Sequence, residues 1–191
     1  MGSVPSHLRR TLGVLGFAAL LAIASSLSAQ SVHIRIAGGT PPDRQILSAA
    51  GDGGKVDLWG IDDRSGRQMW IIEHVPGSRF VHIRVSDGTP YDRRLLSVSS
   101  DGSSCDLFHD DGSGRQLWEI ERIPGSRFVH IRIAGGTPRD RQLLSVYPNG
   151  DRIDLFSHDD GSGHQQWLID EGGQRRDDHD RDRRQDDRRP W

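Results

Sequence analysis

Three short segments of this 191-residue chain place a carboxylate two positions before an aromatic ring. They read Asp57-Leu58-Trp59, Asp106-Leu107-Phe108 and Asp154-Leu155-Phe156. In a β-strand, such a carboxylate and ring project from the same face, because successive side chains alternate. A flat ring packs on the C–H face of a sugar, and a carboxylate accepts hydrogen bonds from its hydroxyls. The predicted carbohydrate-binding residues are these six, together with one acid of the turn just beyond each strand: Asp57, Trp59, Asp63, Asp106, Phe108, Asp111, Asp154, Phe156 and Asp160.

The acidic residues also have a purely structural interpretation. The doublets Asp62-Asp63, Asp110-Asp111 and Asp159-Asp160 lie in segments rich in Gly and Ser. Aspartate is common in turns because its side chain hydrogen-bonds the backbone two residues further on. In that interpretation the acids stabilise turns, and the phenylalanines are simply packed against the fold.

Histidines and paired acids raise the alternatives of a metal site and an enzyme. His33, His82 and His130 recur at equivalent positions, but no compact His/Cys spacing of a zinc site and no Asp-x-Asp-x-Asp calcium loop is present. The paired carboxylates are neighbours in sequence, and glycoside hydrolysis needs them opposed across a cleft. No nucleophile elbow or phosphate loop occurs. We expect no metal, no cofactor and no enzyme activity.

These segments belong to a unit of about 48 residues that occurs three times, the sign of a repeat architecture. The copies span about residues 32–79, 80–127 and 128–173. Each contains four short stretches of period-two alternation separated by turns; in the second copy these are 81–85, 95–98, 105–108 and 116–120. The sequence predicts an all-β fold of twelve strands, closed with pseudo-threefold symmetry so that few strand edges are exposed.

Every copy closes with Gln-x-Trp, and the motif residues are Gln68, Trp70, Gln116, Trp118, Gln165 and Trp167. With three such motifs in register, the chain resembles the ricin B-type β-trefoil family over about residues 32–170. The resemblance implies a secreted, non-enzymatic sugar-binding module with up to three shallow sites. It also implies that the motif residues chiefly hold the core together.

The chain departs from that family at two positions of each repeat. Where the family has a sugar-binding Asp in the second strand, this chain has Ser48, Ser97 and Ser145. Where the family often has an Asn before the motif Gln, it has Arg67, Arg115 and His164. The third-strand aromatic residue is retained, and because only the first repeat carries a Trp there, we expect that repeat to hold the strongest site.

The two ends differ in composition from the middle of the chain. Residues 1–29 combine basic residues, an apolar run from Leu12 to Leu27 and a small residue at Ala29, which is typical of a signal peptide. A membrane anchor is the alternative, but the run is shorter than the roughly 20 residues of a spanning helix. Residues 174–191 are almost entirely Arg and Asp, which predicts a disordered tail. Residues 30–173 form the predicted trefoil domain.

Composition restricts the partners. The net charge of -2 argues against a nucleic-acid surface, and the single Cys105 excludes an internal disulfide. We expect glycans or glycoconjugates as partners, no nucleic acid, no stable membrane insertion after cleavage, and a secreted or periplasmic location. The alternative is a trefoil that serves as a protein-interaction or cell-envelope scaffold and does not bind sugar.

Overall fold

The computed structural model describes residues 30–170, which contain twelve β-strands and no helix. The first repeat contains β1 (Ser31–Ile36), β2 (Ile46–Ala49), β3 (Val56–Trp59) and β4 (Trp70–His74). The second contains β5 (Val81–Val85), β6 (Leu95–Val98), β7 (Cys105–Phe108) and β8 (Trp118–Arg122). The third contains β9 (Val129–Ile133), β10 (Leu143–Val146), β11 (Ile153–Phe156) and β12 (Trp167–Asp170). The predicted all-β fold of twelve strands is confirmed.

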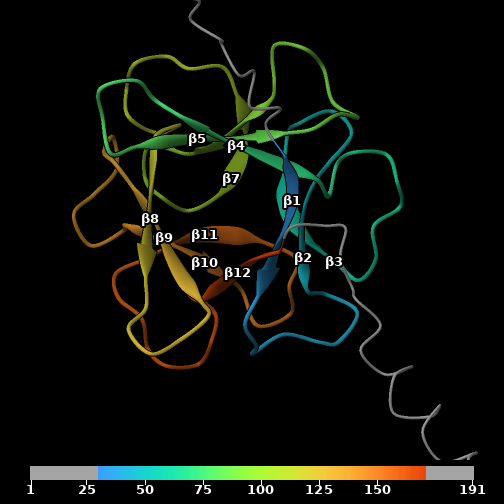
Figure 1. The fold of residues 1–191 in the computed structure, drawn as a ribbon, viewed down its shortest axis with the longest axis vertical. Helices are drawn as coiled ribbons and strands as arrows, with labels where there is room; N and C mark the ends of the chain where they lie inside the picture. Colours follow the sequence, from blue (N-terminus) through green and yellow to red (C-terminus); the bar gives the residue numbers. More distant parts are fainter. Residues whose placement is uncertain (1–29, 171–191) are drawn as a thin grey trace, which may run out of the picture.

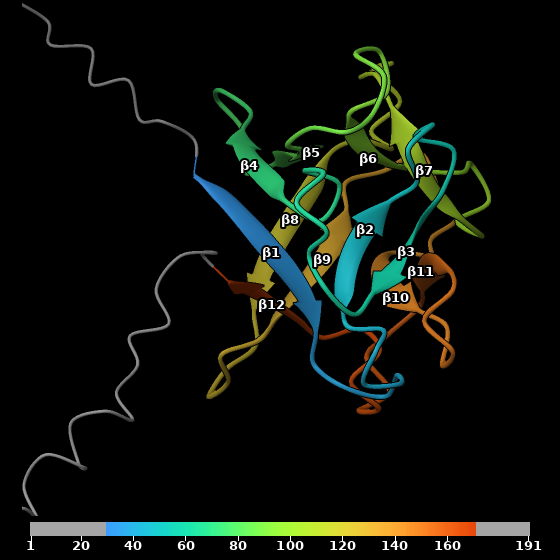
Figure 2. The same ribbon diagram turned by 90° about the vertical axis from the view of Figure 1, so that its right-hand side faces the viewer.

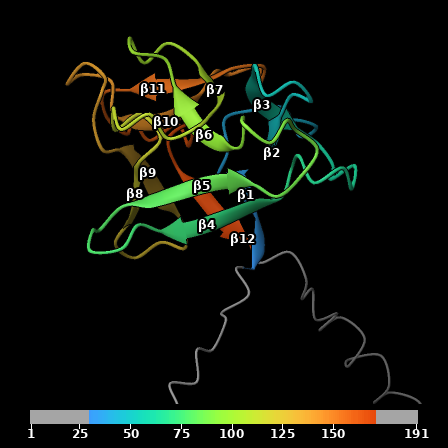
Figure 3. The same cartoon turned by 90° about the horizontal axis from the view of Figure 1, so that it is seen from above.

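Six strands close into a barrel, and three hairpins cover one end of it. The antiparallel pairing runs β1–β4–β5–β8–β9–β12 and returns from β12 to β1. In Figure 1 the pairs β4–β5, β8–β9 and β12–β1 surround a common centre. The hairpins β2–β3, β6–β7 and β10–β11 attach to β1, β5 and β9, and Figures 2 and 3 show them together on one side of the barrel strands. Closure removes the free edges that a barrel strand would otherwise expose.

Strand alternation places the apolar side chains in the interior. In β5, Val81, Ile83 and Val85 are buried, whereas His82 and Arg84 are partly exposed. The largest buried side chains are the three motif tryptophans, all fully buried. Each indole N–H donates a hydrogen bond of 2.9 Å to a backbone carbonyl in the hairpin of its own repeat, and the acceptors are Leu47, Leu96 and Leu144. The motif tryptophan therefore joins the fourth strand to the hairpin in every repeat.

The fourth strand begins later than the sequence pattern predicts. The prediction started this strand at Gln116, but β8 starts at Trp118. The backbone N–H of Leu117 closes a turn onto the Gly114 carbonyl at 3.2 Å. Gln116 is buried, and its side-chain amide donates a hydrogen bond to a serine hydroxyl. Its side chain therefore points inward as in a strand, although the residue lies in a turn. Alternation of buried side chains cannot distinguish these two cases.

Each hairpin turn contacts the next repeat, and the three contacts form a cycle. Backbone N–H groups of the third strands donate to turn carbonyls at 2.8–2.9 Å, in the pairs Leu107–Gly53, Leu155–Gly102 and Leu58–Gly150. Each turn glycine has a positive φ and lies against an arginine of the adjoining repeat, in the pairs Gly53–Arg93, Gly102–Arg141 and Gly150–Arg44. The repeats therefore stabilise one another through their turns as well as through the barrel.

We expect Gly102→Ala to lower the free energy of unfolding by more than Gly112→Ala does. The two glycines have φ of 73° and 71°, so both variants carry the same left-handed penalty of roughly 1–2 kcal/mol. Only at Gly102 does the added Cβ meet a neighbour, the Cβ of Arg141 at 2.8 Å, which adds about 1–3 kcal/mol of overpacking. Urea unfolding measures the difference, and equal midpoints would show that the turn contact tolerates a methyl group.

Two predicted segments lie outside the described residues. These are the signal peptide at 1–29 and the Arg/Asp tail at 174–191, together with the last residues of the predicted 30–173 domain. Within 30–170, no helix is both long and apolar enough to cross a membrane.

Candidate functional site

The third strand of each repeat presents the predicted ring on its outer face. In β3, Val56 and Leu58 are buried, whereas Trp59 is 40% exposed. Phe156 occupies the same place in β11 and is 37% exposed, and Phe108 in β7 is partly buried. The preceding aspartates lie on the same side, where Asp57 and Asp106 are partly exposed. Asp154 differs from them because only 5% of its surface is exposed.

A buried serine and glutamine lie beside each of these aspartates, and the predicted site did not include them. Each serine is the cross-strand neighbour of the aspartate, in the pairs Ser48–Asp57, Ser97–Asp106 and Ser145–Asp154. The motif glutamines donate to these serine hydroxyls at 2.9–3.1 Å, in the pairs Gln68–Ser48, Gln116–Ser97 and Gln165–Ser145. The sequence pattern could have revealed this serine, because it occurs in every copy on the face of the second strand opposite the apolar residues.

Burial raises the pKa of all three third-strand aspartates. Desolvation is the main cause for Asp57 and Asp106, against weaker effects of nearby cations and hydrogen bonds. For Asp154 desolvation raises the pKa to about 6, although Arg141 and Arg152 act in the opposite direction. Asp154 therefore gains and loses its negative charge within the range in which many proteins work.

The second aspartate of each doublet is held by its own turn. Asp63 accepts hydrogen bonds from the Ser65 backbone at 2.9 Å and from Arg67 Nη2 at 2.6 Å. Ser113 and Arg115 bind Asp111 in the same way. The serine and then the arginine lower the pKa of both carboxyl groups to about 2. The turn-stabilising interpretation describes this geometry, and a role of these two acids in sugar binding stays a prediction.

In repeat 3 the predicted residues line one cavity of about 270 Å³. Its walls include Asp154, Phe156 and Asp160, together with Tyr147 and His164. His164 stands where the other repeats have arginine, and its Nε2 lies 2.7 Å from the Gly39 carbonyl oxygen of the first repeat. Tyr147, which is not among the predicted site residues, is 39% exposed and adds a second ring. This cavity combines aromatic surface with two carboxylates.

The corresponding regions of the other repeats are arranged differently. In repeat 1 the Arg67 guanidinium lies 5.8 Å from the centre of the Trp59 ring. The same guanidinium pairs with the Asp63 carboxylate. In repeat 2 a cavity of about 100 Å³ is lined by Ser97, Asp106, Phe108 and Arg115, among others. The prediction that the first repeat binds most strongly stays a prediction.

No protein-family model matches the sequence, and no curated protein matches it. Solved structures do match. An exo-β-1,3-galactanase from Clostridium thermocellum is 20% identical with a TM-score of 0.58, over 75% of this chain and 30% of that one. The designed threefold-symmetric protein ThreeFoil is 17% identical with a TM-score of 0.56, over 73% and 97%. SeviL bound to asialo-GM1 saccharide is 11% identical with a TM-score of 0.56, over 76% and 100%.

The protein is a β-trefoil. At these identities the likeness concerns the fold alone, and this chain spans less than a third of the galactanase.

In repeats 1 and 3 of this trefoil, the histidine of the first strand binds the first aspartate of the doublet. The Nε2–carboxylate distances are 3.0 Å for His33–Asp62 and 2.8 Å for His130–Asp159. They join the barrel to the loop that follows the third strand. Over residues 30–170, no group of three or more His, Cys, Asp or Glu side chains is arranged to hold a metal ion.

Proposed function

We propose that this β-trefoil is a secreted carbohydrate-binding module of the ricin B type that has no catalytic activity. The observation that carries the proposal is the repeat 3 cavity, where exposed aromatic rings and two carboxylates share one shallow surface. Sugars need both kinds of group, since their C–H faces pack on rings and their hydroxyls donate hydrogen bonds.

In this proposal Phe156 packs against one face of a pyranose ring. Asp154 and Asp160 accept hydrogen bonds from its hydroxyls, and Tyr147 contacts the opposite edge. The pseudo-threefold fold repeats the aspartate and the aromatic ring of the third strand in repeats 1 and 2. Single shallow sites bind weakly, and several sites that engage one surface together gain avidity.

Two structural neighbours support a sugar ligand. The SeviL structure contains a saccharide, and the other neighbour is an exo-β-1,3-galactanase. Galactose oligomers joined by β-1,3 links are therefore among the first ligands to test. The galactanase activity is not carried over, because the chain matches only 30% of that enzyme.

A glycan array probed with the purified protein tests the proposal. We expect binding to a defined set of glycans, and we expect Phe156→Ala to weaken it severalfold, since an aromatic contact contributes about 0.5–1.5 kcal/mol. Phe80→Ala is the matched control, because Phe80 lies next to the β4–β5 pair and outside the repeat 3 cavity. A folded protein that binds no glycan would contradict the proposal.

The geometry of repeats 1 and 2 favours a second candidate function, a scaffold that binds protein and not sugar. There Arg67 and Arg115 form ion pairs with the carboxylates of Asp63 and Asp111, which therefore have less capacity to bind sugar hydroxyls. In that case the Arg/Asp tail makes the contacts, and deletion of residues 174–191 removes partner binding. For the sugar-binding trefoil, the same deletion leaves glycan binding unchanged.

Secretion requires that residues 1–29 act as a signal peptide. The measurement is the N-terminal sequence of the protein recovered outside the producing cell. A start near Gln30 is expected, and an intact N-terminus in the membrane fraction would favour the anchor.

A further inference from the structure

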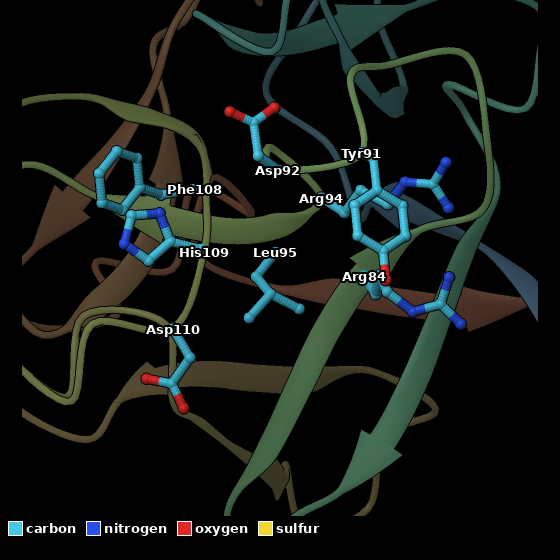
Figure 4. A pocket seen from close by; sticks show the side chains of 8 residues that line it. All are labelled: Arg84, Tyr91, Asp92, Arg94, Leu95, Phe108, His109 and Asp110. Carbon is cyan, nitrogen blue, oxygen red and sulfur yellow. The ribbon is translucent and has the colours of Figure 1, made fainter.

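A cavity of about 520 Å³ lies on repeat 2 and shares no lining residue with the repeat 3 cavity (Figure 4). Its walls come from β5, from the loop between β5 and β6 with the start of β6, and from the end of β7 with the segment that follows it. The volume falls within the roughly 300–1,000 Å³ of typical small-molecule sites. Phe108 lines both this cavity and the smaller one beside Asp106, so the two cavities share a wall.

Two aromatic surfaces face each other across this cavity. The Tyr91 ring lies on one side and the Phe108–His109 pair on the other, with Leu95 between them (Figure 4). His109 stacks on Phe108, with ring centroids 4.2 Å apart and an interplanar angle of 28°. Tyr91 is 87% exposed, a large apolar ring held in solvent. Flat surfaces of this kind suit the C–H faces of a sugar.

Two arginine side chains lie at the edge of the same cavity. The Arg94 guanidinium is 5.3 Å from the centre of the Tyr91 ring, and its buried Nε has no hydrogen-bond partner among the described residues. Arg84 also lines the cavity, and Glu73 binds its Nε at 2.7 Å.

Carboxylates offset these two guanidinium charges. Asp92 and Asp110 line the cavity, and Asp110 Oδ2 lies 3.3 Å from His82 Nε2. With Glu73 already bound to Arg84, the Arg94 guanidinium remains beside the two carboxylates of Asp92 and Asp110, so the acids near the cavity outnumber the arginines by one. A neutral ligand whose groups both donate and accept hydrogen bonds matches such a rim better than an acidic ligand does.

Sequence differences confine this arrangement to repeat 2. Tyr91 is replaced by Pro42 in repeat 1 and by Arg139 in repeat 3. Arg94 is replaced by glutamine in both, and in repeat 3 that glutamine, Gln142, accepts a hydrogen bond of 3.0 Å from Arg132. One residue separates the third-strand ring from the acidic doublet in repeat 2, whereas two separate them in the other repeats.

We propose that this cavity is a second sugar subsite, so that repeat 2 binds a neutral oligosaccharide along both sides of Phe108. One ring occupies the Asp106 side, and the next ring lies between Tyr91 and the Phe108–His109 pair. The guanidinium of Arg94 and the carboxylates of Asp92 and Asp110 bind its hydroxyls. The inference rests on the proposed function and extends it from single sugars to linked ones.

The test compares Tyr91→Ala with the parent on an array of neutral and acidic glycans from mono- to tetrasaccharides. We expect the parent to bind longer chains several times more tightly than single sugars. Tyr91→Ala loses this gain and keeps the binding of single sugars. Because Tyr91 is 87% exposed, its truncation leaves the fold intact, which circular dichroism verifies. Arg139→Ala, the exposed equivalent position of repeat 3, is the matched control and retains the full gain.

Each outcome of this comparison is decisive. Identical chain-length profiles for the parent and Tyr91→Ala would overturn the second subsite while leaving the proposed function in place. A gain confined to acidic glycans would overturn the assignment of a neutral ligand. Absence of glycan binding by the folded parent would contradict the proposed function itself, and the subsite with it.

Discussion

Trp118→Ala is expected to lower the free energy of unfolding by about 3–5 kcal/mol, the range for truncating a large aromatic side chain in a core. The Trp118 ring is fully buried, and its N–H bonds the Leu96 carbonyl at 2.9 Å. The variant leaves a cavity and also an unpaired buried carbonyl, and each effect destabilises the fold. Urea unfolding followed by circular dichroism measures the change.

Trp59→Ala is the matched control for that experiment. Trp59 is 40% exposed and lies on the outer face of its hairpin, so its removal costs about 0.5 kcal/mol or less, as for most surface substitutions. A loss of stability as large for Trp59→Ala as for Trp118→Ala would contradict the placement of the motif indoles in the core. Trp70→Ala and Trp167→Ala are expected to behave like Trp118→Ala, because the same hydrogen bond recurs in all three repeats.

Glycan affinity at repeat 3 is expected to fall about tenfold between pH 7.5 and pH 5. The pKa of Asp154 is raised to about 6, and only its ionised form is a full acceptor for sugar hydroxyls. With that pKa, nearly all of the group is ionised at pH 7.5 and roughly a tenth at pH 5. Calorimetric titration with the best glycan of the array measures the affinity at each pH.

Asp154→Asn separates this effect from the other titrating groups of the cavity. The pKa of Asp160 is lowered by hydrogen bonds from Ser162, so Asp160 stays ionised over this range. His164 also lines the cavity and remains unchanged in the variant. We expect the affinity of Asp154→Asn to vary little with pH; a parent with equally flat affinity would contradict the role of Asp154.

The same pKa predicts a pH dependence of folding. The folded state holds the Asp154 proton more tightly than the unfolded chain, whose carboxyl has an ordinary pKa near 4. Its contribution to stability is therefore present at low pH and is lost as the pH rises through about 6. Unfolding midpoints of Asp154→Asn should lack this decline, which tests the pKa without any ligand.

Local patterns in the sequence determined the strands of this protein. The third strands occur at the predicted residues in every repeat, because period-two alternation is bounded there by Asp-Gly and Asn-Gly turns. The threefold repetition likewise predicted closure, because closure removes exposed strand edges. The predicted start of the fourth strand was wrong, because a buried turn residue such as Gln116 gives the same alternation pattern as a strand residue.

Only the tertiary structure decided which groups are available to a ligand. Asp63 and Asp160 are equivalent in sequence, but Arg67 binds the first, whereas the residue matching Arg67 in repeat 3 is His164, which contacts Gly39 of the first repeat. The cavity between Tyr91 and Phe108 likewise depends on how the loop before β6 packs against the end of β7. Such contacts depend on how separate segments pack together, and no periodicity within one repeat encodes that packing.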